Sequence, residues 1–279
     1  MNHYPSNVKE KLNSIILSMA EHHWLFSKNP GHDFTRQHLG KLSFYDTMRL
    51  IISMGKGSTN DEIMDYFNLD PDLIPSQSAF CQRRRQISLS AFEYLFSEFS
   101  SSFPSTTDKF KDHCILACDG CHVVYATNSD IIEDYNKPRL IDYKGYNHMH
   151  LNGFVDVISK AFLDVVIQPG QQPDEREALH SMLDHFTPDD PQKYIITADR
   201  GYESYDLLFH CELKNLGYVF RVKSPSSPKS ILSYYASEFP DDLEEFDVTI
   251  KRFFTDKATN IMKSQSDVYR YINPSKNTP

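Results

Sequence analysis

The fold is decided by residues 161–223, which hold four consecutive segments: AFLDVVI (161–167), DEREALHSMLDHF (174–186), YIITADRGY (194–202) and GYVFRVK (217–223). Three of these segments contain short apolar runs typical of strands. The second begins with acidic residues and then places apolar residues at helical spacing, which predicts a helix. Another helix is predicted over residues 204–216. Strands that alternate with helices predict an α/β domain with parallel pairing.

A further strand is predicted immediately upstream. Ile115-Leu116-Ala117-Cys118 is a short apolar run that ends at Asp119 and Gly120. Because Asp-Gly is a common hairpin turn, we expect a turn here, followed by a second strand over residues 122–126. Residues 151–158 and 161–167 are predicted as two more strands joined by a turn.

The region before this domain has a helical pattern. Apolar residues recur every three to four positions over residues 8–20, and Ser43 precedes another apolar cluster as a good N-cap. Residues 100–107 have the composition of a linker. The sequence therefore predicts three parts. They are an all-helical region over 1–108, a mixed sheet with flanking helices over 109–224, and an incomplete β-rich insertion and tail over 225–279.

The charge of the chain is unevenly distributed. The 279 residues carry a formal net charge of −9, of which −7 falls within residues 111–223. No apolar run approaches the roughly 20 residues that span a bilayer, and the first residues do not resemble a signal peptide. We therefore expect a cytoplasmic protein that does not contact a membrane. Its five cysteines are expected to be free thiols.

Two aspartates are the first candidates for chemistry. Asp119 and Asp199 each directly follow a short apolar strand. If these strands are neighbours, the two carboxylates converge at the strand ends, where α/β sheets bind their ligands. Two converging carboxylates repel each other unless a divalent cation lies between them, and Mg²⁺ (or Mn²⁺) is the usual ion next to phosphates. The alternative is that each Asp-Gly or Asp-Arg-Gly is only a turn.

Several segments together resemble the DDE transposases of bacterial insertion sequences, family four. The most specific part is Gly217-Tyr218-x-Phe220-Arg221-x-Lys223, which follows Asp199-Arg200-Gly201-Tyr202. Ala117-Cys118-Asp119-Gly120 and Asp174-Glu175-Arg176-Glu177-Ala178 also match in order and spacing. The resemblance covers roughly residues 35–225, and it implies a ribonuclease-H-like catalytic core.

The resemblance also implies an activity. Asp119 and Asp199 would be the first two acids of the DDE triad, hold Mg²⁺, and support hydrolysis of DNA at an element end followed by strand transfer. The family's third acid is a Glu in a Tyr-x2-Arg-x3-Glu-x6-Lys pattern, which residues 224–279 do not contain. The chain is therefore expected to be truncated before the third acid and impaired in catalysis. The alternative function is a non-catalytic DNA-binding remnant of a transposase.

Basic residues are the candidates for contact with DNA. Arg83, Arg84 and Arg85 lie in a predicted helix, where arginine suits phosphates and base edges. Near the second acid, the candidates are Arg200, Tyr202, Arg221 and Lys223. The expected partners are double-stranded DNA and, as a homodimer, a second copy of the chain. Ordinary surface charge and ion pairing are the alternative interpretation of all these residues.

Two other patterns suggest metal ligands. Cys118-x-x-Cys121-His122 has the spacing of haem attachment, and with His113 and Cys114 it could form a zinc site. We favour packing, because a strand would alternate these residues between two faces. His148 and His150 would share one face of a strand, and a half-exposed strand is the favoured interpretation over a metal pair.

Overall fold

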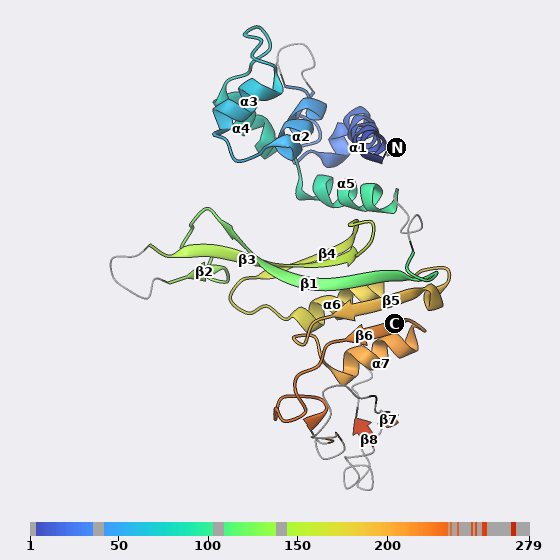
Figure 1. Ribbon diagram of the computed structural model, residues 1–279. Helices are drawn as coiled ribbons and strands as arrows, with labels where there is room; N and C mark the ends of the chain where they lie inside the picture. The colour runs from blue at the N-terminus through green and yellow to red at the C-terminus, as the bar shows by residue number, and fades with distance from the viewer. Residues whose placement is uncertain are drawn as a thin grey trace. The chain divides into compact units, whose positions relative to one another are not determined.

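The computed structural model divides the chain into two compact units, Met1–Pro104 and Ser105–Pro279 (Figure 1). The structure describes residues 4–35, 42–102, 109–137, 144–233, 235, 239, 247, 249, 253–255 and 269–271. Most of the predicted β-rich insertion after residue 233 lies outside this set. Among the described helices, none combines the length and apolar character needed to cross a membrane.

The first unit is helical, as the sequence predicts. Its helices are α1 (Tyr4–Glu21), the short 3-10 helix η1 (His23–Phe26), α2 (Phe44–Ser53), α3 (Thr59–Tyr66), α4 (Gln77–Gln86) and α5 (Leu89–Ser101). Ser43 caps α2 in a reciprocal capping box with Asp46. Ser58 and Ser76 cap α3 and α4 through their side chains. Two apolar clusters, which include Met48 and Phe80, form the core of this unit.

The second unit contains a mixed sheet. Its strands are β1 (Cys114–Tyr125), β2 (Tyr135–Asn136), β3 (Tyr146–Asp156), β4 (Phe162–Pro169), β5 (Tyr194–Ala198) and β6 (Gly217–Phe220). The strands lie in the order β2-β3-β1-β5-β6, and β4 pairs with β3. The pairs β1–β5 and β5–β6 are parallel, whereas β1–β3 and β3–β4 are antiparallel. Two short strands, β7 (Phe253–Thr255) and β8 (Tyr269–Tyr271), pair separately.

The expected turn at Asp119 and Gly120 is wrong. β1 is one continuous strand of twelve residues, and Asp119 and Gly120 pair with Gly153 and Asn152 of β3. The reason is that β3 extends far enough to pair with β1 on both sides of this dipeptide. The expected turn between β3 and β4 is confirmed, and Lys160 adopts a φ of 63° there.

Two helices cover one face of the sheet. α6 (Glu175–His185) begins at the N-cap Asp174, whose side chain accepts bonds from two backbone amides, and α7 (Tyr205–Leu213) begins after Ser204. Their apolar faces bury Leu179, Met182 and Leu207 against Leu116, Phe154 and Ile196 of the sheet. The molecule is thus an α/β protein with a ribonuclease-H-like mixed sheet, preceded by a helical region.

Candidate active site

The two candidate aspartates lie at the same level of the sheet. β1 and β5 are parallel neighbours, and their last paired residues are Cys118 and Ala198. Asp119 follows Cys118 within β1, and Asp199 directly follows the end of β5, so both lie at the same level of two strands that are about 5 Å apart. Both residues are exposed. The strand neighbourhood on which the metal prediction depends is therefore present.

Backbone amides position both carboxylates. The amide of Gly120 donates to Asp119 Oδ1 at 2.9 Å, and the amide of Gly201 donates to Asp199 Oδ1 at 2.7 Å. Each bond leaves the second carboxylate oxygen available to a ligand.

A third carboxylate, which the sequence analysis did not assign, joins them. A side chain built on Gly201 would place its Cβ 2.9 Å from Asp199 Oδ1 and 3.1 Å from Glu175 Oε2. Glu175 lies in the first turn of α6, where the helix dipole favours negative charge. The neighbouring Arg176 ties this turn to the same loop, because its Nε donates to the Gly201 carbonyl at 3.2 Å. The acidic first turn was the sequence signal for Glu175.

A buried histidine also contacts this third carboxylate. His150 Nε2 lies 3.3 Å from Glu175 Oε1. A Cβ at Gly120 would clash with the His150 ring and come 3.0 Å from Asn152 Oδ1, so this position requires glycine. His148 and His150 are both buried, which corrects the expectation of a half-exposed strand.

Asp119, Asp199 and Glu175 are called the carboxylate cluster below. Their oxygens do not all lie within 4.8 Å of one another, since no such group is found here among the described residues. Two Mg²⁺ ions about 3.5–4 Å apart span a wider set of ligands than one ion does. An exposed set of oxygen donors is also the chemistry that Mg²⁺ prefers. The cluster therefore fits this ion in donor type.

Tyr202 does not face a ligand, although it was a candidate for contact with DNA. Its exposed fraction is 1%, and it packs in the core beside Cys118. Burial raises the pKa of Tyr202, and the charges of Glu175 and Asp119 add to the shift. Burial likewise raises the pKa of the Cys118 thiol to about 12. Both groups are neutral packing residues beneath the carboxylate cluster.

Lys223 is held by an internal ion pair. Its Nζ lies 2.7 Å from Glu203 Oε1 and donates to the Arg200 carbonyl at 2.9 Å. Glu203 is buried, and its other oxygen accepts the Lys223 amide at 2.8 Å. This pair fixes the loop after Asp199 to the end of β6. The side chains of Arg200 and Arg221 remain exposed near the cluster.

The three arginines of α4 lie in its last turn, where cations balance the helix dipole. Arg83 is half-buried: it donates to Gln86 Oε1 at 3.1 Å and lies over the Phe34 ring. Arg84 and Arg85 are exposed, with Arg84 over the Phe80 ring. Two of the three predicted arginines are thus accessible.

The zinc and haem alternatives at residues 113–122 find no support in the described residues. Cys114 and Cys118 are buried in the core, whereas Cys121 is exposed. In that part of the chain, no three potential ligands lie within 4.8 Å of one another. The extended conformation of β1 separates them, as the packing interpretation predicts.

Comparison with known proteins assigns the second unit. No curated protein matches the chain. The family described as transposase DDE domain matches residues 110–271, a range that contains the whole carboxylate cluster and more than half of the chain. Proteins of this family are DNA transposases, which act on DNA and in general use a divalent metal. This match covers the sheet and both aspartates, and it shows that the chain belongs to the DDE transposase family.

Proposed function

We propose that this chain hydrolyses a phosphodiester bond at the end of a mobile element and transfers the end to target DNA. The observation that carries the proposal is the parallel register of β1 and β5, because Asp119 follows Cys118 in β1 and Asp199 follows its partner Ala198 at the end of β5. In the first step, water attacks phosphorus and the bond to the 3′ oxygen breaks, leaving a 3′-hydroxyl. In the second step, that hydroxyl attacks a target phosphodiester and displaces its 3′ oxygen.

Asp119 and Asp199 would hold Mg²⁺ or Mn²⁺, with Glu175 as a third carboxylate. When bound, the metal stabilises charge on the phosphoryl oxygens and activates the attacking group. The protein fixes the carboxylates through the Gly120 and Gly201 amides. Arg200 and Arg221 are exposed, and their guanidinium groups would contact DNA phosphates beside the cluster.

Impaired catalysis is a further part of the proposal. Residues 224–279 contain no Glu in the family's Tyr-x2-Arg-x3-Glu-x6-Lys pattern. Glu175 also contacts His150, so one of its carboxylate oxygens already has a partner other than a metal ion. We therefore expect slow nicking by this chain. A protein that binds DNA without nicking it, the non-catalytic remnant, is the second candidate that this missing pattern favours.

Nicking of supercoiled plasmid DNA with Mn²⁺ tests the function, because a single break changes the mobility of the plasmid. Wild-type protein should nick slowly, and Asp119→Asn and Asp199→Asn should abolish nicking. Asp190→Asn is the matched control, since Asp190 is exposed and pairs only with Lys193 at 2.6 Å among the described contacts. Equal nicking by all four proteins would refute the proposal.

Titration of the same proteins with Mn²⁺ separates the two candidates. Removing one carboxylate should weaken Mn²⁺ binding by about tenfold or more, because a unit charge near the ion contributes on the order of 1 kcal/mol or more. Metal and DNA binding without any nicking would assign the non-catalytic remnant. Rapid nicking by the wild type would refute the proposed impairment.

A further inference from the structure

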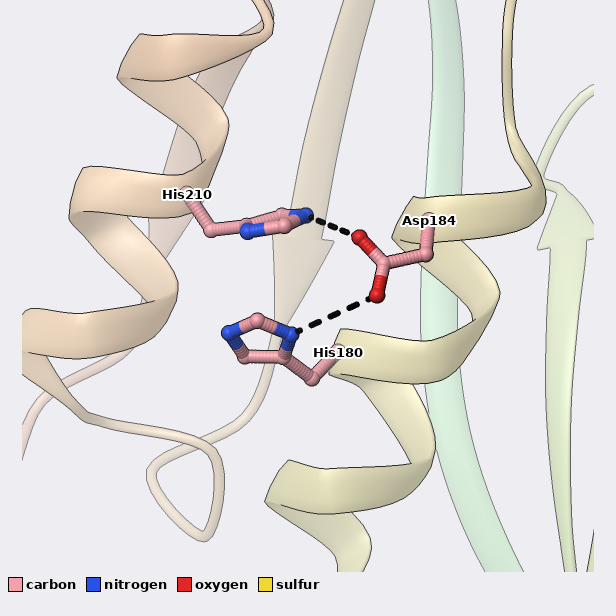
Figure 2. A group of neighbouring side chains, drawn as sticks. All are labelled: His180, Asp184 and His210. Atoms are coloured by element: carbon pink, nitrogen blue, oxygen red, sulfur yellow. Dashed lines mark ion pairs between the residues drawn. The ribbon is translucent and has the colours of Figure 1, made fainter. Parts of the chain in front are cut away.

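Three side chains that no transposase chemistry explains meet between α6 and α7 (Figure 2). His180 and Asp184 are four residues apart on α6 and so share one face of that helix. His210 extends from α7 toward them. One ligand atom from each residue can be chosen so that all three lie within 4.8 Å of one another. We call these three residues the histidine cluster.

The distances within the histidine cluster suit the first ligand shell of a metal ion. His210 Nε2 lies 3.0 Å from Asp184 Oδ1, and His180 Nδ1 lies 3.9 Å from Asp184 Oδ2. Two ligands with metal bonds of about 2.0–2.1 Å in a tetrahedral site are separated by about 3.3 Å. The two observed distances end on different oxygens of Asp184, so a shift of His180 toward Oδ1 would bring both nitrogens to one oxygen.

His210 Nε2 faces Asp184 Oδ1 at 3.0 Å, whereas its other ring nitrogen, Nδ1, has no hydrogen-bond partner among the described residues. The His210 side chain is fully buried. Buried polar atoms without partners are rare and require an explanation such as an ion.

The groups that face His210 come from both helices. His180 and Asp184 approach it from α6, and Lys214 is the C-cap of α7. Lys214 Nζ lies nearby, where it donates to the carbonyl oxygens of Asp184 and Phe186.

We infer that His180, Asp184 and His210 form a binding site for a transition-metal ion of the Zn²⁺ class. Two imidazole nitrogens and one carboxylate oxygen suit such ions, whereas Mg²⁺ prefers oxygen ligands alone. Asp184 is partly exposed, with 39% of its side chain accessible, which leaves water access to a fourth position. The ion would join α6 to α7. This inference does not depend on the proposed DNA chemistry.

Titration of the full chain, purified without a histidine tag, tests the site with Zn²⁺ alone and with Co²⁺ as a spectroscopic substitute. The background is the double variant Asp119→Asn/Asp199→Asn, which removes binding at the carboxylate cluster. We expect one ion per chain, a Co²⁺ absorption spectrum with nitrogen ligands, and a higher unfolding temperature with Zn²⁺.

Substitutions at the cluster then assign the ligands. Asp184→Asn and His180→Gln should each weaken Zn²⁺ binding at least tenfold. His185→Gln is the matched control, because His185 is the next residue along α6 but pairs with Asp164. Far-UV circular dichroism checks that each variant folds. Absence of stoichiometric Zn²⁺ binding, or unchanged affinity in Asp184→Asn, would overturn the inference.

The two proposals can fail separately. If the histidine cluster binds Zn²⁺ and the wild-type chain does not nick DNA, only the proposed activity fails. If His180→Gln leaves the Zn²⁺ affinity of the double-variant background unchanged, and the same substitution in the wild-type chain leaves nicking unchanged, the histidine cluster is a packing contact and the activity stands.

Discussion

The two ends of α6 carry groups of opposite character. Its first turn presents Glu175 to two exposed aspartates, whereas its later turns present His180 and Asp184 to the buried His210. At the first end, like charges gather where solvent screens them and a cation can enter. At the second end, the ring of His210 is enclosed, and burial is the largest cause of its lowered pKa. The same helix thus supports two sites with different ligand preferences.

The largest expected effect comes from loosening α6 itself. Leu179 is fully buried in the core that holds this helix against the sheet. Leu179→Ala should lower the free energy of unfolding by about 2–5 kcal/mol, through lost burial and the cavity that remains. It should also weaken Mn²⁺ and Zn²⁺ binding together, because both clusters depend on the helix. Denaturant unfolding and the two metal titrations measure these effects. Weaker metal binding at one cluster alone would show that the two ends of α6 are independent.

A substitution at Gly120 should affect the first end alone. A side chain there meets the His150 ring and Asn152, so Gly120→Ala should cost about 1–3 kcal/mol and displace His150 from Glu175. Gly31→Ala is the control, because no atom lies within 4 Å of a Cβ at Gly31. The measurements are thermal unfolding and the Mn²⁺ titration. Equal stability of the two variants would contradict the described packing.

A lower pH should reduce the stability of the protein mainly through His210, at the second end of α6. The pKa of His210 is about 4 in the folded protein against 6.5 for the free side chain, so the unfolded chain binds the extra proton between these values. Stability contributed by the neutral ring is complete above pH 6.5 and falls as the pH drops toward 4. The loss from pH 7 to pH 5 should be on the order of 2 kcal/mol. Denaturant unfolding at both pH values measures it.

The variant His210→Gln isolates this contribution from the other titrating groups near it, namely His180, Asp184 and Lys214. Between pH 7 and pH 5, the free energy of unfolding of the variant should fall less than that of the wild type, by the amount that His210 contributes. Identical pH profiles would show that His210 does not stay neutral in the folded chain.

Removing a charge from the carboxylate cluster should have a smaller effect and the opposite sign. Without divalent cations, Asp119→Asn relieves repulsion with its acidic neighbours and should stabilise the fold by a few tenths to about 1 kcal/mol. With Mg²⁺ present, the wild type should gain stability and the variant should not. Unfolding temperatures with chelator and with Mg²⁺ test this, and a destabilised variant in chelator would contradict it.

The smallest effect is expected in the helical unit, away from both clusters. Arg84→Ala and Arg85→Ala should each reduce the salt dependence of duplex DNA binding by about one unit of slope, because each exposed arginine can neutralise a phosphate. Arg83→Ala should instead lower stability, since Arg83 packs over Phe34 and bonds to Gln86. Binding isotherms at several salt concentrations separate these outcomes. An equal salt dependence of DNA binding for all three variants would exclude this face of α4 as a DNA contact.

The sequence predicts the first end of α6 better than the second. The apolar run before Asp199 correctly indicates the end of β5, and acids before an amphipathic segment correctly indicate the start of α6. The strand end predicted at Asp119 is wrong, because β1 continues to Tyr125. His180 and His210 lie 30 residues apart, and only the packing of α6 against α7 brings them together. Tyr202 was misjudged for a related reason: its motif suggested a ligand contact, but its ring fills the core under Cys118.

The uninterrupted length of β1 has a mechanical consequence. Twelve extended residues span about 40 Å, and they contain no hinge between Asp119 and Tyr125. Beyond Cys118 the strand leaves β5 but keeps its pairing with β3 as far as Tyr125. β4 pairs with the same part of β3, so a displacement of that far segment reaches the first aspartate through continuous strands of one sheet and not through a loop.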